Sequence, residues 1–218
     1  MIKLNHIKKS FALPQRSIEV LKDISFSLDK GKSLSIIGPS GSGKTTLLSL
    51  LSGLEHGDSG EIEIAGVKIN NLSENELSHF RAQNIGIIFQ NYHLVSYLTA
   101  KENVELARDI KDNQEDPLKW LDLVGLKDRA NHYPHQLSGG ECQRVAIARA
   151  LIMKPEIIIA DEPSGNLDRE TGNRVMDMLF ALLRQLHSTL VLVTHDEELA
   201  ARTDFRKKLH NGTLIDVD

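Results

Sequence analysis

The sequence contains 218 residues, the length of one large domain or of one domain with an inserted subdomain. Hydrophobic residues make up 40% and charged residues 26%, a near-average composition that excludes a disordered, collagen-like or low-complexity chain. Lysine and arginine number 26 against 30 aspartates and glutamates, and the resulting net charge of −4 disfavours nucleic acid as a partner.

The chain has one cysteine, Cys142, and cannot form an intrachain disulfide, so a reducing cytosol is the default expectation. Its first residues lack the apolar core of a secretion signal, and no window approaches the roughly 18 apolar residues of a membrane-spanning helix. We therefore expect a protein that is neither secreted by that route nor membrane-spanning.

The first part of the chain is rich in predicted β-structure. Short strands are expected at Ile2–Ile7, Ile18–Leu28, Ser33–Ile37, Glu61–Ile64 and Val67–Ile69. The last two alternate and are joined by a short turn, which is typical of an antiparallel pair. The sequence thus predicts an N-terminal antiparallel β subdomain.

Helices begin to alternate with strands within the same region. An apolar helical run at Leu47–Leu54 follows a glycine-rich loop. The sequence Ser73-Glu74-Asn75-Glu76 is a capping box and predicts a helix that ends near Gln83, before a strand at Ile85–Phe89.

From about Tyr92 to Gln136 the pattern becomes helical, with helices expected at Lys101–Ile110 and Pro117–Val124. We expect residues 1–218 to form a single domain and residues 92–136 to be a helical subdomain inserted in it.

The strand pattern resumes at Glu156–Ala160 and at Thr189–Thr194. Between these strands, apolar residues spaced by three or four positions predict an amphipathic helix that packs on the sheet. They are Val175, Leu179, Leu182, Leu183 and Leu186. This alternation predicts an α/β fold with a mostly parallel core sheet.

The most specific motif is a glycine-rich loop between a predicted strand and helix. The residues Gly38-Pro39-Ser40-Gly41-Ser42-Gly43-Lys44-Thr45 match G-x-x-x-x-G-K-[ST], and Thr46 follows them. Such a loop turns its backbone N–H groups towards a phosphate chain, and the helix N-terminus adds a positive dipole end. We expect Lys44 to reach the β- and γ-phosphates and the Thr45 hydroxyl to bind Mg²⁺. A glycine-rich surface turn is the alternative interpretation.

A second candidate site lies where the apolar run Ile157–Ala160 ends in Asp161-Glu162-Pro163. A buried parallel strand would hold both carboxylates at the carboxyl edge of the sheet. We expect Asp161 to bind the metal and Glu162 to activate the attacking water as a base. An ordinary acidic turn is the alternative, and the phosphate loop earlier in the chain argues against it.

The sequence Leu137-Ser138-Gly139-Gly140-Glu141 opens an amphipathic helix, with Ser138 as its predicted N-cap. The exposed helix start is a second place that favours an anion. It is either a capped helix and nothing more, or a site for the nucleotide of a neighbouring copy.

Together these motifs resemble the ATP-binding subunits of ABC transporters. Ser138 follows Lys44 by 94 residues and Asp161 follows Ser138 by 23, as in that family. The resemblance covers essentially the whole chain and implies an ABC-type P-loop NTPase fold and ATPase activity.

The resemblance also assigns roles to four single residues. Gln90 is similar to the glutamine that in the family touches Mg²⁺ and the attacking water. His195 resembles the histidine that contacts the γ-phosphate. Asp168 resembles the aspartate that links two nucleotide sites, and Phe11 the aromatic residue that stacks on adenine.

The family mechanism implies two copies that face head to tail. Each ATP would lie between the loop Gly38–Thr46 of one copy and Ser138, Gly139 and Gly140 of the other. Mg²⁺ would be bound by Thr45, Gln90 and Asp161, with Lys44 and His195 stabilising charge. The motion would pass to a separate integral membrane subunit, which places the chain at the cytoplasmic face of the inner (plasma) membrane.

Within the family, Ala160–Asp168 and the lack of a regulatory domain after Asp218 resemble the branch of lipoprotein release, macrolide export and cell division. Two positions depart from it: Ser164 stands where threonine is usual, and Cys142 where a polar residue is common.

Three other functions remain as alternatives. One is a soluble ABC ATPase of DNA repair or translation, but those chains carry two ATPase halves or a long coiled coil. The second is a regulatory ATPase of cell division. The third is a non-catalytic nucleotide sensor, which would lack Glu162 or His195, and both residues are present.

Overall fold

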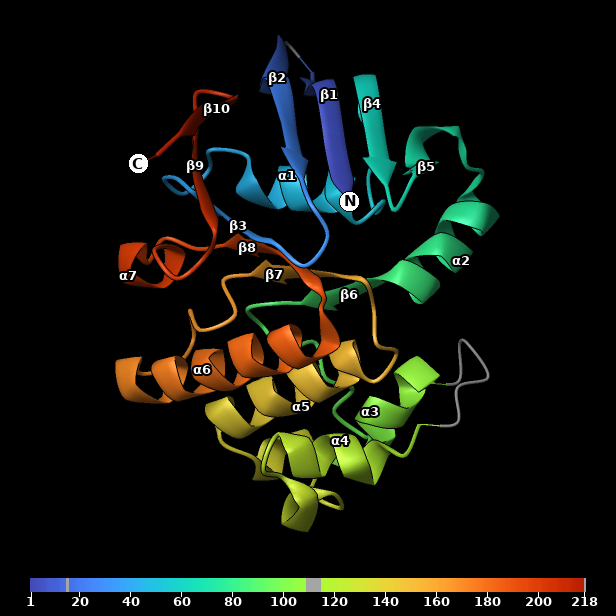
Figure 1. Cartoon of the computed structure of the whole chain (residues 1–218), viewed down its shortest axis with the longest axis vertical. Helices are drawn as coiled ribbons and strands as arrows, with labels where there is room; N and C mark the ends of the chain where they lie inside the picture. Colours follow the sequence, from blue (N-terminus) through green and yellow to red (C-terminus); the bar gives the residue numbers. More distant parts are fainter. Residues whose placement is uncertain (15, 109–114, 218) are drawn as a thin grey trace. The chain divides into compact units, whose positions relative to one another are not determined.

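The computed structural model describes residues 1–14, 16–108 and 115–217 of the chain (Figure 1). These residues form two compact units, one of Met1–Arg81 with Thr189–Asp218 and the other of Ala82–Ser188. The second unit is wider than the segment 92–136 that the sequence predicts as an inserted subdomain. That subdomain stays a prediction, and its residues 109–114 lie outside the described part of the chain.

The first unit is built on a mixed sheet. Its strands are β1 (Ile2–Leu13), β2 (Arg16–Leu28), β3 (Ser33–Ile37), β4 (Ser59–Ile64), β5 (Val67–Lys68), β8 (Thr189–Val193), β9 (Phe205–His210) and β10 (Thr213–Asp216). They follow the order β5-β4-β1-β2-β10-β9-β3-β8. β1 pairs antiparallel with β2 and β4, and Figure 1 shows these three strands side by side. β3 pairs parallel with both β8 and β9.

The helices of the first unit follow its turns. They are α1 (Lys44–Leu51), the short 3-10 helix η1 (Ile69–Asn71), α2 (Glu74–Asn84), whose last turn enters the second unit, and α7 (Glu197–Ala200). The predicted capping box starts α2, because the Glu76 carboxylate accepts from the Ser73 N–H at 2.8 Å. Leu47, Leu50 and Leu51 of α1 are fully buried.

The second unit holds two parallel strands, β6 (Ile85–Ile88) and β7 (Ile157–Asp161), and a set of helices. The helices are α3 (Ala100–Arg108), α4 (Pro117–Leu123), η2 (Lys127–Arg129), η3 (Pro134–Gln136), α5 (Gly139–Leu151) and α6 (Arg169–Leu186). In α6 the apolar face predicted from the sequence is buried at Val175, Leu179, Leu182 and Leu183. Asp116 caps α4 by accepting from the Leu118 N–H at 2.9 Å.

Several predicted boundaries were wrong. The strand predicted to end at Ile7 continues to Leu13 as β1. The sequence pattern breaks earlier, because His6 adopts a positive φ of 51° and shifts in register interrupt the alternation of side chains along the strand. α1 ends at Leu51 rather than Leu54, since Gly53 takes a φ of 65° that stops the helix. The predicted helix 101–110 is found as Ala100–Arg108, and positions 109 and 110 lie outside the described residues.

The sequence pattern does not predict the hairpin of β9 and β10. Its first strand has the sequence FRKKLH, in which only Leu209 is fully buried, so neither an apolar run nor a clear alternation marks it. Pairing with β3 holds the strand in place: Leu34 lies opposite Phe205 and Ile37 opposite Lys208.

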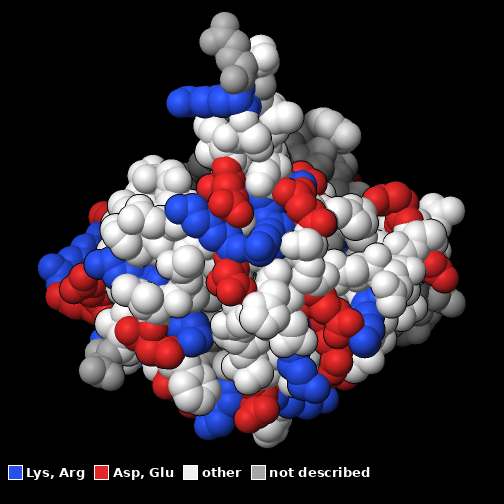
Figure 2. Space-filling model, turned by 90° about the horizontal axis from the view of Figure 1, so that it is seen from above, with Lys and Arg blue, Asp and Glu red and all other residues white. Residues whose placement is uncertain are grey.

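Charged side chains of both signs are scattered over the face drawn in Figure 2. On the face drawn in Figure 2, acidic and basic groups are interspersed rather than gathered into one patch of a single sign. Among the described residues, no helix is both long and apolar enough to cross a bilayer.

The end of α6 generates a prediction about stability. His187, the C-cap, has a left-handed φ of 54°, which costs a residue with a Cβ atom about 1–2 kcal/mol. His187→Gly should therefore raise the free energy of unfolding by about 0.5–1 kcal/mol, measured by urea denaturation. His187→Ala keeps the Cβ atom and should give no gain; an equal gain in both variants would contradict this explanation.

Candidate active site

The phosphate loop lies in the first unit, where its residues 38–43 join β3 to α1 and its last residues begin α1. β3 lies between β8 and β9, and Leu34 and Ile36 are buried. The strand is therefore fixed on both sides at the point where the loop begins.

Two glycines of this loop are required by close contacts. A Cβ atom on Gly38 would lie 2.6 Å from the carbonyl oxygen of Leu209. Gly43 has a φ of 101°, and a Cβ atom there would lie 2.8 Å from Cγ1 of Val20. Any larger residue would push the loop away from β2 or β9.

The Lys44 ammonium binds two carbonyl groups of its own loop. Its Nζ donates to the carbonyl oxygens of Gly38 at 2.8 Å and Pro39 at 3.0 Å, and the residue is only 8% exposed. Both acceptors are neutral, so they leave the positive charge of the ammonium uncompensated. In addition, Ser42 Oγ is buried and has no hydrogen-bond partner in the part of the chain that the structure describes. A cation and an unused hydroxyl in one loop fit an anionic phosphate group.

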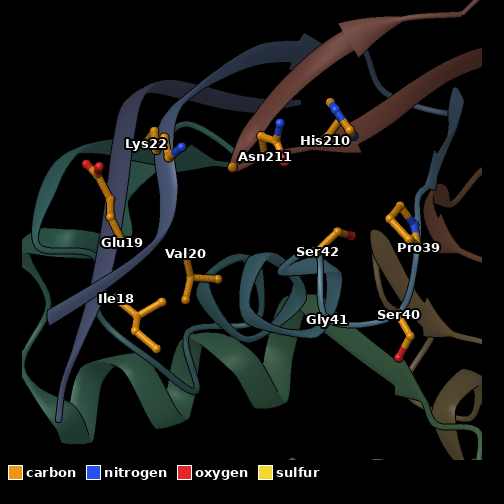
Figure 3. A pocket seen from close by; sticks show the side chains of 11 residues that line it. Ile18, Glu19, Val20, Lys22, Pro39, Ser40, Gly41, Ser42, His210 and Asn211 are labelled. Atoms are coloured by element: carbon orange, nitrogen blue, oxygen red, sulfur yellow. The ribbon is translucent and has the colours of Figure 1, made fainter. Parts of the chain in front are cut away.

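A cavity of about 390 Å³ adjoins the loop (Figure 3). The loop residues Pro39–Ser42 line it, and Ile18 and Val20 of β2 supply apolar side chains. The charged residues Glu19 and Lys22 of β2 also line it, as do His210 at the end of β9 and the turn of residues 211–212 after it. No motif marks these β2 and hairpin residues, so the sequence alone does not predict them as part of a site.

Phe11 lies on β1 directly opposite Ile18 of β2, so the two side chains share one face of the sheet. Phe11 is 40% exposed, and the Nζ atom of Lys9 lies 5.1 Å from the centre of its ring. Lys9 is itself held by Glu55 at 2.8 Å. The structure thus places an available aromatic ring beside a residue that lines the cavity.

His195 follows β8 and reaches the same edge of the sheet as the phosphate loop. Ile36 of β3 lies opposite Val193 of β8, so Gly38 and His195 each stand two residues beyond a matched pair. The His195 side chain is exposed, and Asp196 after it caps α7.

In the second unit, the register of β6 and β7 brings Gln90 and Glu162 to one edge. Ile88 lies opposite Ala160, and each polar residue stands two positions beyond that pair. Glu162 has a positive φ of 45°, a strained conformation for a residue with a Cβ atom. Asp161, the last residue of β7, is half-buried.

The start of α5 is a complete capping box. The Ser138 hydroxyl accepts from the Glu141 N–H at 3.3 Å, and the Glu141 carboxylate accepts from the Ser138 N–H at 2.8 Å. The hydrogen bond from the Ser138 backbone, with help from the Ser138 hydroxyl and from Arg129, holds the pKa of Glu141 below its ordinary value. The predicted N-cap role of Ser138 is confirmed.

The two glycines after Ser138 pack closely within the second unit. A Cβ atom on Gly139 would lie 2.9 Å from the hydroxyl oxygen of Tyr92, and one on Gly140 would lie 2.5 Å from Cγ2 of Thr171. The first turn of α5 is therefore fixed between two other segments.

Asp168 caps α6 by accepting from the Thr171 N–H at 3.0 Å, and this backbone hydrogen bond lowers the pKa of Asp168. Cys142, one turn into α5, is buried, and burial raises the pKa of its thiol. A raised thiol pKa gives a cysteine little reactivity at neutral pH.

The predicted site residues thus form two groups. Phe11, the phosphate loop and His195 belong to the first unit, while Gln90, Ser138–Gly140, Asp161–Glu162 and Asp168 belong to the second.

Comparisons with known proteins identify the family. The sequence matches the family model described as ABC transporter over residues 21–165. It is 41% identical to the uncharacterized ABC transporter ATP-binding protein YbbA of Escherichia coli K12, over 98% of this chain and 96% of that protein. It is 46% identical to the lipoprotein-releasing system ATP-binding protein LolD of Bacteroides thetaiotaomicron, over 98% of this chain and 99% of that protein.

Solved structures agree with this result. A dimeric structure of the ATP-binding cassette MJ0796 in a post-hydrolysis state, bound to ADP and Pi, matches with a TM-score of 0.89. The identity is 36%, and the match covers 100% of this chain and 99% of that chain. The protein belongs to the ABC transporter family.

Three predictions are confirmed by these matches. The fold is the α/β fold of ABC-type P-loop NTPases, and the chain is an ATPase of that family. The expected resemblance to the lipoprotein-release branch is also found.

The capping box generates a prediction of pH dependence. Because its folded-state pKa is lowered, ionised Glu141 adds stability above the ordinary glutamate pKa of about 4.3, and this is lost as the pH falls through the lowered value. Glu141→Gln should therefore reduce the free energy of unfolding at pH 7 and reduce it less at pH 3. Denaturant unfolding at both pH values measures the difference, and a difference independent of pH would contradict the assignment.

Proposed function

We propose that this protein is the ATP-hydrolysing subunit of a membrane complex, and that two copies bind ATP between them. The phosphate loop with Lys44 is the observation that carries the proposal. Its sequence is that of a phosphate-binding loop, and among the described residues the nearly buried Lys44 ammonium is bound by neutral carbonyls alone. The dimeric form of the MJ0796 cassette supports the pairing of copies.

In the first unit, the Lys44 ammonium exchanges the Gly38 and Pro39 carbonyls for phosphate oxygens when ATP binds. Phe11 stacks on the adenine, and the apolar side chains of Ile18 and Val20 in the adjoining cavity exclude water from the bound nucleotide. His195, at the same sheet edge as the loop, donates to the γ-phosphate.

In the second unit, Glu162 takes the proton of the attacking water, and Gln90 orients that water from the neighbouring strand end. The oxygen atoms of Gln90 and Asp161 are of the kind that Mg²⁺ prefers, and they would bind the ion. The family pattern assigns the hydroxyl of Thr45, in the first unit, to the same ion. When bound, Mg²⁺ neutralises charge that develops on the β- and γ-phosphates.

The residues Ser138, Gly139 and Gly140 complete the site of the other copy. The first N–H groups of a helix have no partner within the helix, and the dipole of α5 favours an anion at this end. The capping box and the close packing of both glycines hold these groups in position before a nucleotide arrives. Asp168, at the start of α6, links the two nucleotide sites.

We place the chain at the cytoplasmic face of the inner membrane, beside an integral membrane subunit that it drives. The names of its relatives, which include a lipoprotein-releasing ATP-binding protein, support lipoprotein release or a related export or force-transmitting process. ATP binding closes the pair of copies, and hydrolysis reopens it.

The role of Glu162 can be tested by a single substitution. Glu162→Gln keeps the size of the side chain but removes the base, so turnover should fall on the order of 10²–10⁴-fold while the Kd for ATP stays within about twofold. A steady-state ATPase assay and a fluorescent ATP-analogue titration measure the two quantities.

Glu74→Gln is the matched control, because Glu74 lies on α2 with a side chain that is 77% exposed. It should leave turnover unchanged. Unchanged turnover in Glu162→Gln would reject Glu162 as the base, and an inactive wild-type protein would reject the proposed function.

A further inference from the structure

The loop after the catalytic carboxylates binds the Gln90 segment through one side chain, that of Asn166. Its Oδ1 accepts from Nε2 of Gln90 at 3.1 Å. Its Nδ2 donates to the backbone carbonyl of Gln90 at 3.0 Å and to Oδ1 of Asn91 at 2.9 Å. One carboxamide thus contacts both the side chain and the backbone of Gln90.

Gly165 makes room for this contact. A Cβ atom on Gly165 would lie 2.8 Å from Nε2 of Gln90 and 3.2 Å from its Cδ. The Gln90 carboxamide therefore lies directly against the backbone of the loop, and a Cβ atom at position 165 would displace it.

The same loop is joined to Glu162. The Gly165 N–H donates to the carbonyl oxygen of Glu162 at 2.9 Å, and the Leu167 N–H donates to that of Ser164 at 3.0 Å. Asn166 thus lies in the second of two overlapping turns, Ser164–Leu167, and the first of them, Glu162–Gly165, begins at the proposed base. The position of Asn166 is therefore tied to that of Glu162 through the backbone of this loop.

The segment after Gln90 is held from its other side by α5. The Arg149 guanidinium donates to the carbonyl oxygens of Tyr92 at 2.7 Å and His93 at 2.6 Å. Both of these residues have left-handed φ values, 57° and 48°, so the bonds stabilise a strained backbone. Because that backbone is fixed, Asn166 acts on the orientation of the Gln90 side chain.

We propose that Asn166 is a positioning residue that fixes which end of the Gln90 carboxamide faces the reaction. With Nε2 engaged by Asn166, the remaining polar atom is Oε1, the only atom of the group able to bind a cation or accept from water. Without Asn166 the carboxamide can turn by 180° and present its NH₂ group instead. This inference rests on the proposed role of Gln90 in ATP hydrolysis.

A double-mutant cycle tests the proposal. Asn166→Ala should lower kcat roughly 3–10-fold, the effect of one or two lost hydrogen bonds, with KM for ATP changed less than about twofold. Gln90→Ala should lower kcat about tenfold or more. The double variant should match Gln90→Ala alone, because Asn166 has nothing left to orient. Effects that multiply in the double variant would overturn the proposal.

Two further variants separate orientation from folding. Asn166→Leu keeps the branched shape and the number of side-chain heavy atoms of asparagine but forms no hydrogen bond, and it should lose as much kcat as Asn166→Ala. The control Asn131→Ala, at an exposed turn of the same unit, should behave as wild type. If Asn166→Leu retained full kcat, the hydrogen bonds would have no role and the proposal would be rejected.

A measurement without nucleotide gives a second readout. In NMR spectra, the side-chain NH₂ signals of Gln90 should shift towards free-glutamine values in Asn166→Ala and not in Asn131→Ala. Unshifted signals would contradict the pairing. A wild-type protein without ATPase activity would instead reject the proposed function. If the wild type is active and the losses of kcat in Asn166→Ala and Gln90→Ala multiply in the double variant, only the inference about Asn166 is rejected.

Discussion

The hydrogen bonds from Lys44 to two carbonyl groups of its own loop stabilise the part of the protein that we expect to bind phosphate. A nearly buried ammonium is costly unless oxygen atoms surround it, and here neutral carbonyls of Gly38 and Pro39 supply them. The loop is thereby held in a curled form before any ligand binds. The contact of Gly38 with Leu209 ties that form to β9, so the loop geometry follows from the order of strands in the first unit.

Strand register determines where the other polar residues of the candidate site lie. In each unit, parallel pairing puts a polar residue two positions beyond a matched apolar pair, as with His195 after Val193 and Glu162 after Ala160. Capping adds a second constraint, because Ser138 and Asp168 begin the helices α5 and α6 and so have fixed side chains. Residues expected to meet nucleotide are therefore held by the same bonds that start helices and end strands.

The sequence predicted the parts of the molecule that depend on local pattern. Short-range chemistry determines the strand at Ser33–Ile37, the loop between it and α1, and the cap at Ser138, and these were found as predicted. That the loop binds phosphate stays a prediction. The hairpin β9–β10 was missed because its stability comes from pairing with β3 rather than from its own basic sequence. The bond between Gln90 and Asn166 joins residues 76 positions apart, and no spacing rule connects them. The left-handed backbone of Tyr92 and His93 could not be predicted from the sequence either, since the Arg149 side chain that stabilises it comes from α5.

The central claim is that ATP is bound between two copies of this chain, each of which supplies part of the site. Sedimentation velocity of the Glu162→Gln protein, with and without Mg²⁺ and ATP, tests it most directly. We expect a shift from the 24.3 kDa monomer to a species of twice that mass when ATP is added. A protein that binds ATP yet stays monomeric, both alone and within its native assembly, would contradict it.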